Sequence, residues 1–151
     1  MREIKYRGIS QYTGEMVYGQ LLRGENDFNI VTNFSRAIDI ELIPIKKGTQ
    51  GQYTGLKDKN GREIYEGDVT ELEVDGEIRR FVVKIKTVIR EVVSHPSFND
   101  DTAKVAITGV VFEWNGFELF PCVDENGEFD NTKMVVIGNI YKNPELLEVN
   151  R

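Results

Sequence analysis

Apolar and basic side chains alternate along residues 78–90. The apolar positions are Phe81, Val83, Ile85 and Ile89, and the basic positions between them are Arg80, Lys84, Lys86 and Arg90. A period of two over this length is typical of a β-strand with one face towards a core and the other towards solvent. The pattern therefore predicts a long strand with a basic face.

A second strand is predicted from residue 104, but its apolar positions change parity at Gly109. Val105 and Ile107 precede the glycine, and Val110, Phe112 and Trp114 follow it. An extra residue in one strand shifts the alternation in this way. The sequence therefore predicts a β-bulge at Gly109.

Tight turns are indicated by Asn-Gly or Asp-Gly pairs at residues 60–61, 75–76, 115–116 and 126–127. These residue types tolerate the positive φ angles that hairpin turns require. The pair at 115–116 separates two apolar and aromatic runs, so we expect a hairpin there. Helical patterning is scarce, apart from a terminal turn with Asn143 as cap and Pro144 as first residue. The chain is therefore predicted to be mainly β.

The first third of the chain predicts further strands. A hairpin is expected from residues 3–7 and 16–22, and strands are expected at 28–31 and 38–43. The pattern breaks after residue 43, which favours a domain boundary near residues 45–50. Residues 94–101 are expected to form a polar loop between two strands.

The composition fits a protein that builds its own core. The chain has 151 residues, with 19 Lys plus Arg against 25 Asp plus Glu and a net charge of −6. The single cysteine, Cys122, excludes an internal disulfide. No apolar run reaches the ~18 residues of a membrane span, and the first eight residues lack the apolar segment of a signal peptide. We expect a cytoplasmic protein of one domain, or of two very small ones, without membrane contact.

Four segments carry a resemblance to a known family: REIKYRG at 2–8, GEMVYGQL at 14–21, GQYTGLKDKNGREIYEGDV at 51–69 and VIGNIYKNPELL at 136–147. With them the chain resembles the YopX protein family, small proteins encoded by phages and prophages of Gram-positive bacteria. The resemblance implies a mostly β protein whose C-terminal part is similar to an SH3-type barrel. It also implies self-association in the host-cell cytoplasm, and it brings no established activity or catalytic residue.

Together, the patterns predict an N-terminal β-hairpin region at 1–48 and a glycine-rich connector at 49–68. For residues 69–151, the resemblance implies a C-terminal SH3-like small β-barrel. Polar and aromatic side chains of the connector form a candidate binding loop, since function concentrates on loops held by rigid scaffolds. They are Tyr53, Lys57, Asp58, Arg62, Glu63, Tyr65 and Asp68. We favour the alternative that this segment is a structural linker whose glycines serve tight turns.

Motifs for catalysis or cofactor binding are missing from the sequence. It contains no phosphate-binding loop, dinucleotide fingerprint or nucleophile elbow, so we expect no cofactor. His95 and Cys122 are the lone imidazole and thiol, too few for a zinc site. We expect a solvated His95, a buried Cys122 and no metal. A carboxylate-dependent enzyme using Asp58, Glu63, Glu66 or Asp68 is one alternative hypothesis, although no catalytic motif accompanies these acids.

The one electrostatic anomaly is the basic face formed by Arg80, Lys84, Lys86 and Arg90. Small β-barrels often bind nucleic acid on such a face, but here no aromatic residues interleave with the cations, and the protein is acidic. We favour a solvated face, or one that contacts an acidic patch of another subunit. The preferred hypothesis is thus a non-enzymatic accessory protein that contacts itself and a host or phage protein; a nucleic-acid-binding module is the first alternative.

Overall fold

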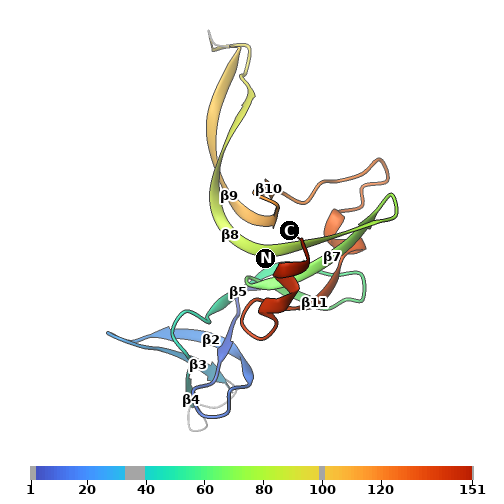
Figure 1. Cartoon of the computed structure of the whole chain (residues 1–151). Coiled ribbons are helices and arrows are strands. Elements are labelled where there is room, and N and C mark those ends of the chain that lie inside the picture. The colour runs from blue at the N-terminus through green and yellow to red at the C-terminus, as the bar shows by residue number, and fades with distance from the viewer. Residues whose placement is uncertain (1–2, 33–39, 99–100, 151) are drawn as a thin grey trace.

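The computed structural model describes residues 3–32, 40–98 and 101–150, and it consists of two antiparallel β-sheets (Figure 1). The six-stranded sheet has the order β4 (Glu41–Pro44), β3 (Phe28–Thr32), β2 (Met16–Arg23), β1 (Tyr6–Ile9), β5 (Gly51–Lys57) and β6 (Glu63–Tyr65). The five-stranded sheet has the order β10 (Phe117–Leu119), β9 (Thr102–Trp114), β8 (Glu77–Val93), β7 (Asp68–Val74) and β11 (Val135–Asn139). The prediction of a mainly β chain is confirmed.

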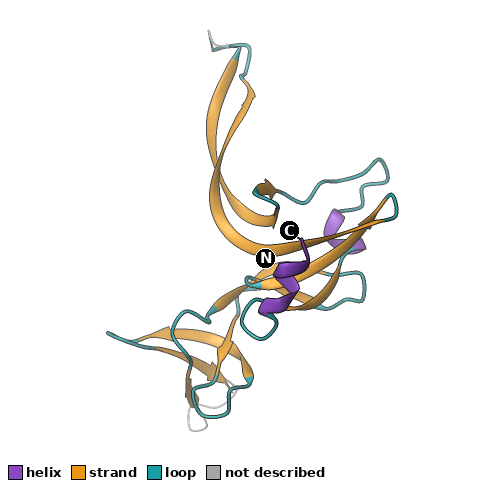
Figure 2. Ribbon diagram, in the orientation of Figure 1, coloured by secondary structure: helices purple, strands orange, loops and turns teal. Residues whose placement is uncertain are grey.

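Two short 3-10 helices complete the described structure: η1 (Asp130–Lys133) and η2 (Pro144–Asn150) (Figure 2). The second begins at Pro144, as predicted for the terminal turn. Within the described residues, neither helix has the length and apolarity needed to cross a membrane.

The predicted N-terminal strands are present. β1 pairs with β2 as an antiparallel hairpin, and β3 pairs with β2 on its other side. A strand was expected at 38–43, and β4 coincides with its second half. Residues 38–39 lie outside the described residues.

The hairpin turns at Asn115-Gly116 and Asp75-Gly76 are confirmed. Asn115 and Gly116 have φ angles of 47° and 81°, and Asp75 and Gly76 have 51° and 80°. Both central residues of each turn are thus in the left-handed region that a type I′ turn requires. These turns join β9 to β10 and β7 to β8.

β8 and β9 extend beyond the rest of their sheet as a two-stranded ribbon (Figure 1). β7 pairs with β8 as far as Val82, and β10 pairs with β9 as far back as Phe112. The pairing of β8 with β9 continues to Val93 and Thr102. We call residues 86–93 and 102–109 the arm.

The β-bulge predicted at Gly109 is wrong, because the register between β8 and β9 runs without a shift along these described strands. The change of parity has another cause. Gly109 shares its face of the ribbon with Val105 and Ile107, since residues two apart lie on one face. A Cβ atom at Gly109 would lie 3.5 Å from Cε1 of Phe120. The chain after β10 therefore covers the face opposite the main core.

The main core joins the two sheets. It consists of Ile64, Phe81, Val83, Phe112, Met134 and Val136, all of them buried. Ile64 comes from β6, at the edge of the six-stranded sheet, whereas four of the others come from strands of the five-stranded sheet. Burial of side chains from both sheets in one cluster couples them through the hydrophobic effect.

The SH3-type barrel implied by the resemblance is not confirmed. Neither sheet closes on itself in the part of the chain that the structure describes, and each ends in two edge strands. The segment expected to be a turn-rich connector contributes strands β5 and β6 to the six-stranded sheet. The domain limits at residues 48 and 68 stay predictions.

Replacing Gly116 with valine should destabilise the fold by about 1–3 kcal/mol, because a β-branched residue would have to adopt a φ angle near 81°. Urea unfolding measures the free energy. Asn115→Gly is the matched control, and its stability should change little because glycine tolerates positive φ. A Gly116→Val protein as stable as the wild type would contradict the turn assignment.

Candidate functional site

An open groove lies where β1, β2 and β6 meet, and it brings together part of the predicted binding loop. Its volume is about 450 Å³, and it is lined by Lys5, Arg7, Tyr18, Gly61, Arg62, Glu63 and Tyr65. We call it the tyrosine groove. Arg62, Glu63 and Tyr65 were predicted from the sequence, whereas Lys5, Arg7 and Tyr18 were not.

Arg7 of β1 forms a buried ion pair with Asp68, the first residue of β7. Nη2 of Arg7 lies 2.6 Å from Oδ1 of Asp68, and the two side chains are 3% and 1% exposed. The second carboxylate oxygen of Asp68 accepts the backbone N–H of Tyr65 at 2.8 Å. Burial raises the pKa of the Asp68 carboxyl, an effect that Arg7 and the Tyr65 N–H only partly offset. Asp68 is therefore a structural anchor rather than an exposed acid.

Three tyrosine rings pack around this ion pair. The ring of Tyr65 stacks on Tyr53 and meets the edge of Tyr18, with centroids 5.4 Å apart in both pairs. The guanidinium of Arg7 lies 4.9 Å from the Tyr65 ring centroid, within the range of cation–π contact. Burial, with Glu63 nearby, raises the pKa of the Tyr65 hydroxyl. Tyr65 thus stays neutral and serves as an aromatic wall.

Lys5 and Glu63 close one side of the groove as an ion pair. The hydrogen bond to Glu63 raises the pKa of Lys5, so the ammonium group stays charged. The same Nζ lies 4.8 Å from the ring centroid of Tyr53. Glu63 is therefore already neutralised, and the groove as a whole favours anionic groups.

The remaining predicted loop residues, Lys57 and Asp58, are not part of the groove. Asp58 is buried and accepts three backbone N–H groups, from Asn60, Arg62 and Val136, at 2.8–3.0 Å. Lys57 is exposed, and its carbonyl accepts a hydrogen bond from Asn131. Asp58 thus organises the turn between β5 and β6, whereas Lys57 connects the end of β5 to η1.

Each carboxylate considered for catalysis has a structural partner. Asp58 and Asp68 hold backbone N–H groups, Glu63 pairs with Lys5, and Glu66 accepts the N–H of Ile85 at 3.4 Å. In residues 3–32, 40–98 and 101–150, no group of three or more His, Cys, Asp or Glu side chains is placed to hold a metal ion. The arrangement suits binding better than proton transfer.

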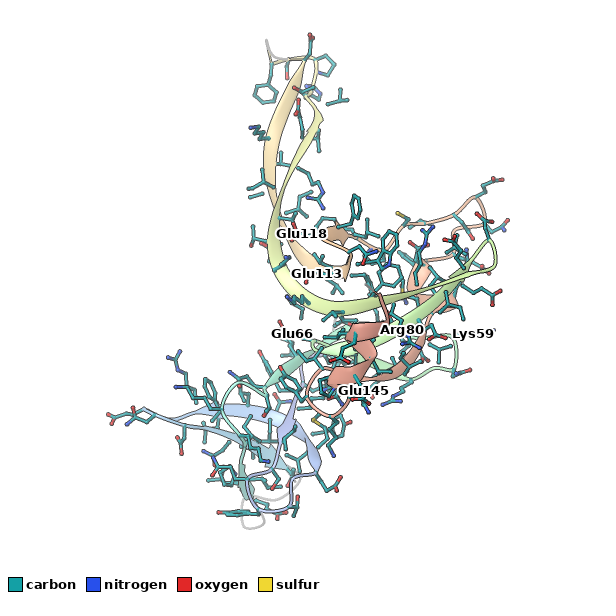
Figure 3. The ribbon with its side chains drawn as sticks, in the orientation of Figure 1. Lys59, Glu66, Arg80, Glu113, Glu118 and Glu145 are labelled. Atoms are coloured by element: carbon teal, nitrogen blue, oxygen red, sulfur yellow. The ribbon has the colours of Figure 1, made fainter. Side chains whose placement is uncertain are left out.

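The basic face of β8 meets acidic side chains from its own chain. Arg80 pairs with Glu71 of β7 at 3.1 Å, and Lys84 pairs with Glu113 of β9 at 2.9 Å. Figure 3 shows Glu113 and Glu118 close together at the base of the arm, where both pair with Lys86. Burial alone would raise the pKa of the Glu113 carboxyl, but the nearby ammonium groups of Lys86 and Lys84 outweigh this effect and lower it.

Arg90, the last predicted residue of the basic face, packs on the chain that follows β10. Its guanidinium lies 5.7 Å from the Phe120 ring centroid and donates to the carbonyl of Glu118. The acidic groups expected on another subunit are therefore supplied in large part by neighbouring strands of the same chain.

The lone imidazole and thiol are both exposed. His95 lies in the loop at the end of the arm, where Nδ1 contacts the Ser97 hydroxyl at 2.6 Å, which agrees with a solvated histidine. The prediction that Cys122 is buried is wrong. β10 ends at Leu119, so Cys122 belongs to a loop rather than to a core-facing strand.

The sequence did not reveal three groove residues that lie far from the predicted loop along the chain: Lys5 directly before β1, Arg7 in β1 and Tyr18 in β2. The one signal for them was their position within two of the motifs, REIKYRG and GEMVYGQL.

Comparison with known proteins finds similarity to a protein family and to a solved structure. The family model described as YopX protein matches residues 5–148. The fold is similar to the crystal structure of protein EF1440 from Enterococcus faecalis, with a TM-score of 0.51 and 22% identity over 97% of this chain and 99% of that one. At this identity the likeness shows the fold alone. Among curated proteins, no match is found.

Replacing Asp68 with asparagine should destabilise the protein by ~3–5 kcal/mol, because the Arg7 charge would remain buried without its partner. Asparagine retains an oxygen that can accept the Tyr65 N–H. The loss of stability therefore measures the effect of removing the Asp68 charge. Chemical unfolding of Arg7→Met, Asp68→Asn and the double variant forms a double-mutant cycle.

In this cycle the double variant should lose less stability than the two single variants together. Lys142→Met, which breaks the exposed pair with Glu15, is the control and should cost less than ~1 kcal/mol. Strictly additive losses at Arg7 and Asp68 would show that the two charges do not interact.

Proposed function

The chain belongs to the YopX protein family, and on that premise we propose that it is a phage or prophage accessory protein that acts through protein–protein contacts as a homo-oligomer. A host or phage protein would be its further partner, and the host-cell cytoplasm its place of action. A single, exposed cysteine is consistent with a reducing compartment.

The arm is the observation that carries this proposal. Several of its apolar side chains are open to solvent, although Val88 is buried: Ile89 is 59% exposed, Val93 86%, and Phe98 at the end of the arm 69%. Exposed apolar surface of this kind is typical of protein-interaction sites. A ribbon of two strands is also only marginally stable in water unless another element packs against it.

The edges of the arm point to the same function. Among the described strands, none pairs with the outer edge of β8 beyond Val82 or of β9 before Phe112. Unpaired edges offer backbone N–H and C=O groups to another chain, and natural proteins normally cover them. A second protein chain that packs on the arm would cover both the edges and the apolar side chains.

The two alternative functions have weaker support. The cations of the basic face have intramolecular partners, and the net charge of −6 opposes the approach of phosphate groups. The acids of the predicted loop are engaged with backbone N–H groups or with Lys5. Contact with proteins therefore fits the described surface better than nucleic-acid binding or catalysis.

Removal of the arm should abolish self-association while the body stays folded. Thr87 and Thr108 lie opposite each other, so Asn-Gly can join them directly, as it joins β9 to β10. Light scattering after gel filtration should give a multiple of 17.3 kDa for the wild type and about one subunit mass for the shortened chain.

Far-UV circular dichroism and cooperative unfolding of the shortened chain provide the folding control. The homo-oligomer is refuted by a wild-type mass near 17.3 kDa over a wide concentration range. An oligomer that persists without the arm would place the contact elsewhere on the molecule.

A further inference from the structure

We propose that the end of the arm of one copy docks in the tyrosine groove of a second copy. This inference rests on the proposed function: it adds an anchor at the end of the arm to the packing of a second chain along the edges of the arm. The two surfaces have complementary chemistry, and within one chain they lie far apart.

The tyrosine groove is cationic and aromatic, although the protein is acidic overall. Of the three cations that line it, Lys5 pairs with Glu63 and Arg7 pairs with the buried Asp68, so Arg62 supplies the positive charge. Arg62 is exposed, and in the described part of the chain its guanidinium has no hydrogen bond or salt bridge. The Tyr18 side chain on the wall is 48% exposed. The groove thus presents an unpaired positive charge beside an open ring.

Arg7 at the base of the groove contributes stacking rather than a free charge, because its guanidinium pairs with Asp68. Its Nε is buried and has no hydrogen-bond partner among the described residues. The Arg7 guanidinium already stacks on Tyr65, which shows that arginine and aromatic side chains can pack together at this place. A partner that brings one ring and one carboxylate would match both features of the groove.

The end of the arm presents such a pair. Phe98 is 69% exposed, and Asp101 is exposed as well. Backbone hydrogen bonds hold both residues at the end of the ribbon, from Phe98 N–H to the His95 carbonyl at 2.9 Å and from Ser94 N–H to the Asp101 carbonyl at 3.1 Å. In the groove, the Phe98 ring would lie against Tyr18 while the Asp101 carboxylate meets Arg62.

A chain cannot fill its own groove. Figure 1 shows the end of the arm on the opposite side of the molecule from β1 and β2, which carry groove residues. The contact must therefore join two copies. A contact between two different surfaces closes as a two-fold reciprocal pair, in which each arm enters the other copy's groove, or head to tail as a ring.

A complementation experiment tests the contact. The groove variant is Tyr18→Ser with Arg62→Glu, and the end-of-arm variant is Phe98→Ser with Asp101→Lys. Each variant alone should self-associate about tenfold more weakly or worse, because each loses its anchoring side chains. An equimolar mixture should form a heterodimer, since the intact groove of one variant can take the intact arm of the other.

Sedimentation velocity with one variant fluorescently labelled measures all three samples, and thermal unfolding establishes that each variant is folded. Tyr12→Ser with Glu25→Lys is the matched control, because it removes an exposed ring and reverses an exposed charge elsewhere. This control should associate like the wild type.

The outcomes separate this inference from the proposed function. A monomeric wild type refutes both. A wild-type oligomer that the groove and end-of-arm changes leave intact refutes the docking alone, and the groove would then take another occupant. Dissociation of both variants without recovery in the mixture also refutes the docking, because the changes would then act indirectly.

Discussion

The buried ion pair between Arg7 and Asp68 is the interaction on which the arrangement of the two sheets depends. Arg7 belongs to β1 in the six-stranded sheet, and Asp68 is the first residue of β7 in the five-stranded sheet. Two charges taken out of water are costly unless each finds its partner, so the positions of both strands are tightly specified. The Tyr65 N–H bound by Asp68 also fixes the end of β6.

Both candidate surfaces follow from that junction. Fixing the end of β6, which β5 separates from β1 in the sheet, places Tyr65 and Glu63 next to Lys5 and Tyr18. This arrangement creates the tyrosine groove. It also brings Ile64 into the core with Phe81 and other residues of the five-stranded sheet, so that the base of β8 is anchored. The arm can then project from a rigid base while several of its apolar side chains remain exposed.

Local features of the fold could be predicted from the sequence, but long-range pairs could not. Asn115-Gly116 specifies its turn by itself, because both residues accept positive φ. Arg7 and Asp68 are 61 residues apart, and nothing in the alternation around either residue identifies the other. The burial of Cys122 and the bulge at Gly109 were predicted wrongly for a related reason: both depend on where the chain goes after β10.

Hydrogen–deuterium exchange at two protein concentrations tests the central claim, contact through the arm, most directly. At high concentration, the amides of residues 86–93 and 102–109 should exchange more slowly than at low concentration, because a second chain covers the open edges. Amides of the main-core strands should exchange equally at both concentrations. Arm amides that exchange at one rate regardless of concentration would contradict the account.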